Sequence, residues 1–71
     1  MWTVVKYQNG EEVEDYGVMQ ARNIIQLVKM LEKKFGVTGL KYEKMEHFKA
    51  PTYQVFHGTN YETWLEVSKY N

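Results

Sequence analysis

The chain has 71 residues, no cysteine and a formal net charge of zero. This length fits one domain, residues 1–71, and the missing thiols exclude disulfides and argue against a structural zinc site. A balanced charge argues against a general nucleic-acid coat or an acidic DNA mimic. No apolar run approaches the ~20 residues of a membrane span, and no signal-peptide pattern is visible, so we expect a cytoplasmic protein.

The first third of the chain is expected to form a β-hairpin. Residues 2–8 combine β-branched and aromatic side chains, which favour a strand. Asn9-Gly10 is a strong turn signal because both residues tolerate a positive φ. A short acidic return strand is expected over residues 11–16, with Gly17 ending it.

Residues 19–36 are expected to form one amphipathic helix. Apolar side chains recur there at helical spacing and define one buried face: Ile24, Leu27, Val28, Leu31 and Phe35. Gly36 can adopt the left-handed conformation that ends a helix, and Val37 follows where an apolar side chain usually packs back on the last turn.

The remaining residues are expected to complete the sheet. Residues 40–47 alternate in charge, with Leu40 and Tyr42 on one face, and residues 52–57 are typical of a strand. A turn is expected at residues 58–60. Residues 61–70 are compatible with a strand or a short helix, and their alternating pattern favours the strand. The prediction is an α+β domain, ββαβββ, with one helix packed on a small antiparallel sheet.

Aromatic side chains are expected on the sheet face that the helix does not cover. Several strands are apolar on both sides, although one helix covers only one face. Tyr7, Phe56 and Trp64 fall on the uncovered side and are predicted to form an exposed patch. Such a patch usually marks an interaction surface, for a partner or a second copy of the chain. A minor structural core is the alternative.

Basic side chains define a second candidate surface. Residues 20–50 carry seven basic and three acidic side chains, whereas residues 1–19 carry one lysine and four acids. Arg22, Lys29 and Lys33 are expected on the exposed face of the helix, with Lys34 beside them. These four side chains would suit phosphate groups, although the exposed face of an amphipathic helix commonly looks the same.

Catalytic and metal-binding patterns are weak. The chain has no cysteine and one serine, Ser68, and its glycines match no phosphate-binding loop. The acidic run at residues 11–15 lacks the ligand spacing of a calcium loop and suits a solvated edge strand. His47 and His57 are expected to be surface residues. We therefore expect no enzymatic activity, no cofactor and no metal.

The hypothesis that the sequence favours is a small non-enzymatic interaction module that uses the uncovered sheet face. Its size resembles that of accessory or regulatory proteins encoded by phages and mobile elements, which is an analogy only. The expected partner is another protein or a second copy of the chain. The alternative is a nucleic-acid-binding protein that uses the basic helix surface.

Overall fold

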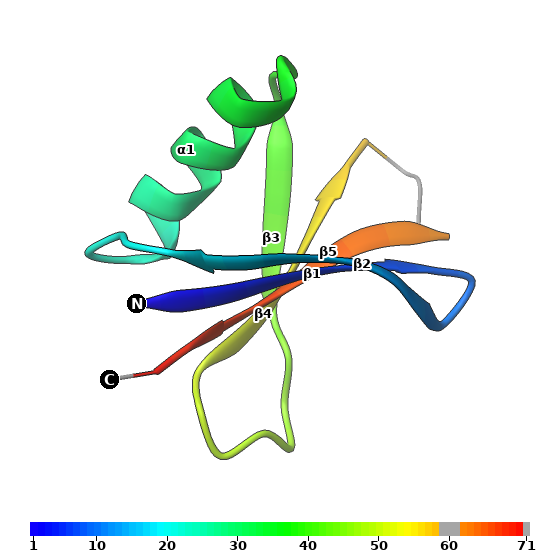
Figure 1. Cartoon of the computed structure of the whole chain (residues 1–71), viewed down its shortest axis with the longest axis vertical. Helices are drawn as coiled ribbons and strands as arrows, with labels where there is room; N and C mark the ends of the chain where they lie inside the picture. The colour runs from blue at the N-terminus through cyan, green and yellow to red at the C-terminus, as the bar shows by residue number, and fades with distance from the viewer. Residues whose placement is uncertain (59–61, 71) are drawn as a thin grey trace.

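The structure, a computed structural model, describes residues 1–58 and 62–70. Within these residues, five strands form one antiparallel sheet in the order β2-β1-β5-β4-β3, and one helix packs against one side of it (Figure 1). The elements are β1 (Trp2–Gln8), β2 (Glu11–Met19), α1 (Ile24–Phe35), β3 (Leu40–Lys44), β4 (Thr52–His57) and β5 (Thr63–Lys69). The predicted α+β architecture with the order ββαβββ is confirmed.

The hydrophobic core lies between α1 and the sheet. Leu27 and Leu31 of the helix are fully buried, as are Val4 and Val67 on the adjacent central strands. Trp2 also belongs to this core, and its indole N–H donates to the carbonyl of Ala21, 3.1 Å away. Because strand side chains alternate, burial of residues 2 and 4 assigns the odd-numbered residues of β1 to the opposite face.

The first hairpin forms at the expected turn, but its second strand is longer than predicted. Asn9 and Gly10 both have positive φ, at 53° and 82°. Gly17 does not end the strand. It adopts a φ of 79° inside β2, where the β1–β2 register shifts, and its N–H donates to the Asp15 carboxylate over 2.8 Å. The glycine therefore forms a β-bulge, and the strand continues to Met19.

The helix begins later than the expected residue 19, because Asn23 caps it. The Asn23 side chain accepts a hydrogen bond from the Gln26 N–H over 2.9 Å, and Gln26 reaches back to the N–H of Arg22. These reciprocal bonds resemble a capping box, which fixes the first turn at Ile24. The predicted end is confirmed, since Gly36 is left-handed with a φ of 67°.

The C-terminal half forms the rest of the sheet. β3 ends at Lys44 rather than at residue 47, because the chain turns after Met45, whose N–H still bonds the carbonyl of Thr52. β4 has the predicted bounds. The ambiguous C-terminal segment is a strand over Thr63–Lys69. The turn expected at residues 58–60 and the start of the segment at residue 61 lie outside the described residues, except for Gly58.

Candidate interaction face

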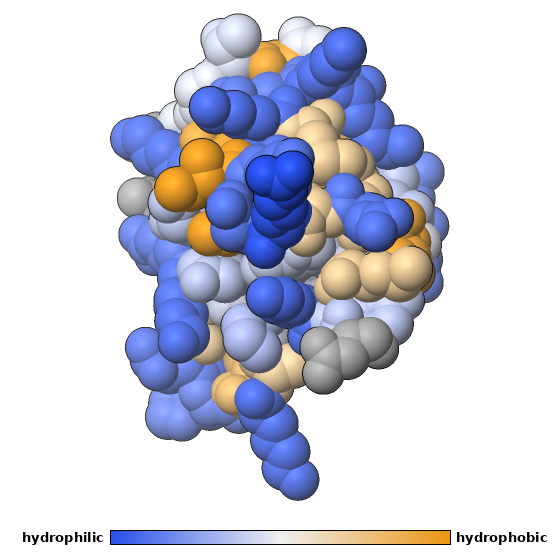
Figure 2. Space-filling model, turned by 90° about the vertical axis from the view of Figure 1, so that its left-hand side faces the viewer, coloured by the Kyte–Doolittle hydropathy of each residue, from blue (hydrophilic) through white to orange (hydrophobic). Residues whose placement is uncertain are grey.

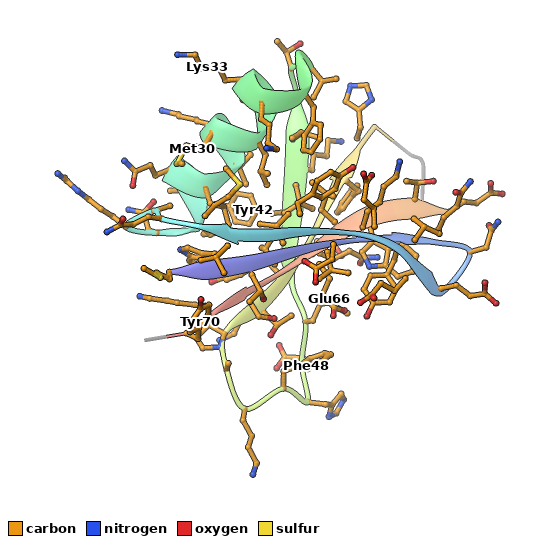
Figure 3. All side chains as sticks on the ribbon, in the orientation of Figure 1. Met30, Lys33, Tyr42, Phe48, Glu66 and Tyr70 are labelled. Atoms are coloured by element: carbon orange, nitrogen blue, oxygen red, sulfur yellow. The ribbon has the colours of Figure 1, made fainter. Side chains whose placement is uncertain are left out.

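The sheet face opposite α1, which we call the helix-free face, is built from the three central strands. Strand alternation and the registers place every second residue of each strand there. Figure 3 shows the labelled Glu66 on this side of the sheet and Tyr42 on the side of the helix. The face consists of Thr3, Val5 and Tyr7 from β1, Trp64, Glu66 and Ser68 from β5, and Thr52, Gln54 and Phe56 from β4.

Two of the three predicted aromatic residues stack on each other. Tyr7 and Trp64 are direct cross-strand partners, and their ring centroids lie 5.6 Å apart with an interplanar angle of 5°. Both side chains are half-buried. Stacked rings at this separation stabilise a sheet beyond the area that they bury. We call these two residues the aromatic pair.

Phe56 differs from the expectation of an exposed residue. It lies on the helix-free face by strand alternation, but only 6% of its surface is exposed. Its position on β4, between β3 and β5, makes it an interior residue of the sheet. The exposed patch is therefore narrower than predicted, and Phe56 acts as a packing residue beside the aromatic pair.

Carboxylates border the aromatic pair. Glu12 is the cross-strand partner of Tyr7 on β2, and Glu66 is the diagonal neighbour of Tyr7 on β5. The negative charge of Glu66 raises the pKa of the Tyr7 phenol, with smaller contributions from burial and from Glu12. Burial raises the pKa of the Glu66 carboxyl itself. Both effects disfavour negative charge here, so this end of the face would gain from a cation.

Glu66 has no ion-pair partner among residues 1–58 and 62–70. The indole N–H of Trp64 is also buried without an acceptor in the described part of the chain. An unsatisfied donor of this kind costs about 1–3 kcal/mol. The Glu66 carboxyl thus lacks a cation and the Trp64 indole N–H lacks an acceptor among these residues.

The other end of the helix-free face is polar and internally satisfied. The hydroxyls of Thr52 and Ser68 lie 2.9 Å apart, and Thr52 also donates to the carbonyl of Ala50. Thr3 donates weakly to the carbonyl of Ser68 over 3.4 Å. These groups bond one another, whereas the buried Trp64 indole N–H at the aromatic end has no acceptor within the described part of the chain.

The predicted basic surface lies on the other side of the molecule. Lys29, Lys33 and Lys34 are exposed on α1, whereas Arg22 is exposed in the loop before the helix rather than on it. Figure 2 shows a side of the molecule that is largely hydrophilic with separate apolar areas. We call Arg22, Lys29, Lys33 and Lys34 the basic ridge. The sheet separates it from the aromatic pair, so the two candidate surfaces do not form one site.

The remaining candidate residues, which are acidic or histidine side chains, do not come together in one site within the described residues. The acidic run on β2 is exposed along a sheet edge, His47 lies in the loop after β3, and the His57 ring lies 3.1 Å from the carbonyl of Thr38. In the part of the chain that the structure describes, no three His, Asp or Glu side chains converge as metal ligands. No described helix is long and apolar enough to cross a bilayer.

A shallow pocket between the end of α1 and the sheet was missed from the sequence. Its volume is about 180 Å³, and its walls include Tyr16, Phe35 and Leu65, with Trp64 of the aromatic pair also contributing to the lining. The rings of Tyr16 and Phe35 pack edge to face, with their centroids 5.1 Å apart. These two residues are far apart in the sequence, so no local sequence pattern indicates the contact. Ligand sites usually enclose roughly 300–1,000 Å³, so this hollow is smaller than a typical small-molecule site.

Comparison with known proteins finds no family model that matches the chain, and no curated protein or solved structure with significant similarity.

Proposed function

We infer that this chain is a non-enzymatic, cytoplasmic interaction module, and that the aromatic end of its helix-free face binds a basic side chain of a partner protein. The observation that carries this proposal is the stacked Tyr7–Trp64 pair bordered by Glu66 and Glu12. A cation over an aromatic face is attracted by the ring quadrupole, and tryptophan is the best such ring. A neighbouring carboxylate adds a charge-assisted hydrogen bond.

Arginine fits this arrangement better than lysine. Its planar guanidinium stacks on a ring while its N–H groups reach a carboxylate, whereas an ammonium is a compact and strongly hydrated charge. Tyrosine, tryptophan and arginine are also the residue types that dominate interface energetics. The half-buried Glu66 lacks a cation within the described residues, and a partner arginine would supply one.

The proposal is tested by an NMR titration of the isotope-labelled chain. The probe is a short Gly/Ser peptide with one central arginine, and matched peptides carry glutamine or glutamate in its place. We expect saturable shifts at the Trp64 indole N–H and the Tyr7 amide with the arginine peptide only. The core residue Trp2, whose indole N–H bonds Ala21, serves as an internal control.

Glu66→Gln provides the matched variant for this titration. Removing the carboxylate charge should weaken arginine binding while the fold is kept, because glutamine has nearly the same shape. Equal responses to the arginine and glutamate peptides, or shifts confined to α1, would rule out the proposed site. If Glu66→Gln binds the arginine peptide as tightly as the wild type, the Glu66 carboxylate does not contribute to binding.

Nucleic-acid binding by the basic ridge is the second candidate. All four basic side chains are exposed, and Lys33 and Lys34 lie in the last helical turn. Against this candidate, the aromatic side chains that would stack bases lie on the opposite face of the sheet, bordered by carboxylates that repel phosphates. The helix-free face is therefore the preferred binding surface, and the ridge is tested separately by its salt dependence.

A further inference from the structure

The two edges of the sheet differ in how they meet solvent. β2 forms one edge, and it is acidic, contains a left-handed glycine and shows two register irregularities. Charges and bulges of this kind keep other strands from pairing with an edge. β3 forms the other edge and stays in regular register with β4 over all five of its residues. Among the described residues, the β3 edge is thus the regular one.

The hydrogen-bond pattern shows which residues of β3 face outward. In an antiparallel pair, the backbone groups of successive residues point alternately toward and away from the partner strand. The Met45 N–H points inward to Thr52, whereas the Leu40 N–H points outward and is taken by the Glu32 carboxylate over 3.0 Å. Tyr42 and Lys44 therefore present their backbone groups to the open edge.

We propose that β3 pairs with β3 of a second copy of this chain, antiparallel and about a twofold axis at Tyr42. Tyr42 exchanges both backbone hydrogen bonds with its counterpart, and the Lys44 N–H donates to the Leu40 carbonyl of the other copy. On the helix-free face, Lys41 then lies opposite Glu43 of the other copy, and the symmetry creates this pair twice. The strand is therefore complementary in charge to itself.

The charges also select this register over its neighbours. An axis at Lys41, Glu43 or Lys44 would place identical charges directly opposite each other, which is unfavourable in a sheet. An axis at Leu40 would leave most of the strand unpaired. Charges usually protect a short edge strand from arbitrary partners. In β3, the opposite charges of Lys41 and Glu43 favour pairing with a second copy of the strand in the register centred on Tyr42.

The dimer is expected to be weak and dependent on concentration. A five-residue strand buries little area, and interfaces below ~1,200 Å² are typical of transient complexes. Tyr42 is 40% exposed and would gain burial against its counterpart on the helix side of the sheet (Figure 3). This interface does not involve the aromatic pair, so it stands independently of the proposed function.

Charge reversal tests the pairing by sedimentation equilibrium at ionic strength low enough to preserve ion pairs. Lys41→Glu and Glu43→Lys each place like charges opposite one another at both symmetric positions, and each should weaken dimerisation about tenfold. The double reversal restores both pairs and should dimerise like the wild type. Lys49→Glu, an exposed loop change of the same charge, is the matched control and should have no effect.

Amide exchange provides a second measurement on the folded wild-type chain. The Tyr42 and Lys44 amides should become more protected as protein concentration rises, whereas the outward Leu40 amide, already bonded to Glu32, should change less. A wild-type chain that stays monomeric up to ~1 mM would overturn the proposal. So would single reversals that dimerise like the wild type, or a double reversal that dimerises no better than the single ones.

Discussion

Single residues explain both the stability of the core and the unusual chemistry of the helix-free face. Leu31 of α1 is fully buried between the helix and the sheet, whereas Glu66 is half-buried on the opposite sheet face without a cation among the described residues. Burial of the apolar Leu31 side chain stabilises the fold, whereas burial of the Glu66 carboxyl disfavours its charged form. Residues of a binding site often lower the stability of the fold, because they are suited to function rather than to folding.

Leu31→Ala should lower the free energy of unfolding by about 2–5 kcal/mol, the usual range for removing a buried leucine side chain. A domain of this size has only ~5 kcal/mol in total, so the variant should be largely unfolded at 37 °C. Thermal unfolding followed by circular dichroism measures the effect. Ile25→Ala is the matched control, because Ile25 is 55% exposed on the same helix. An unchanged melting temperature for Leu31→Ala would mean that the side chain does not support the core.

Glu66→Gln should stabilise the chain at pH 7. Burial raises the folded-state pKa above the ordinary value of 4.5, so ionisation of this carboxyl opposes folding. The penalty is complete above the folded-state pKa and absent below the unfolded value. Urea midpoints of the two proteins should therefore differ at pH 7 and converge below pH 4.5. A less stable variant at pH 7 would show that the ionised carboxylate has a stabilising partner.

The presence of a strand is easier to predict from the sequence than the residues at which the strand ends. The bounds of β1 and β4 agree with those predicted, because the β-branched and aromatic side chains that favour a strand are a local property of the sequence. The helix start was placed too early, although Asn23 and Gln26 have the spacing of a capping box and were an available signal. The length of β2 was not readable, since a glycine inside a bulge looks like a strand end.

Site geometry depended on pairing that the sequence does not contain. Alternation placed Tyr7 and Trp64 on one face, but only the β1–β5 register makes them neighbours and brings Glu66 beside them. The burial of Phe56 was also out of reach, because alternation gives the face of a side chain and not its depth. Long-range register therefore decided the composition of the site.

Replacing Arg22, Lys29 and Lys33 together by glutamine tests the basic ridge. Little change in stability is expected, because exposed charges contribute little to folding. If the ridge binds nucleic acid, the wild type will bind single- or double-stranded oligonucleotides at ~50 mM salt and the triple variant will not. Fluorescence anisotropy measures both. No wild-type binding at this salt concentration would eliminate the nucleic-acid hypothesis.

In the part of the chain that the structure describes, one helix packs on one sheet and leaves the other sheet face uncovered by α1. The order β2-β1-β5-β4-β3 puts the C-terminal strand at the centre, beside the N-terminal strand. β1 and β5 lie side by side (Figure 1), and this arrangement brings Tyr7 and Trp64 together from opposite ends of the chain. It also places the regular β3 strand at one edge of the sheet, at the opposite edge from the bulged β2.

Binding of a basic side chain by the aromatic pair is tested by the affinity of a Tyr7→Leu/Trp64→Leu variant for the arginine peptide. Leucine keeps these positions apolar but removes both π faces, and buried Phe56 is left intact so that the sheet is not opened. Affinities are compared by calorimetry after circular dichroism has confirmed an unchanged fold. We expect a folded variant whose affinity falls about tenfold or more, the scale of a desolvated cation–π contact. A folded variant that binds the peptide as tightly as the wild type would show that the aromatic pair does not bind the basic side chain.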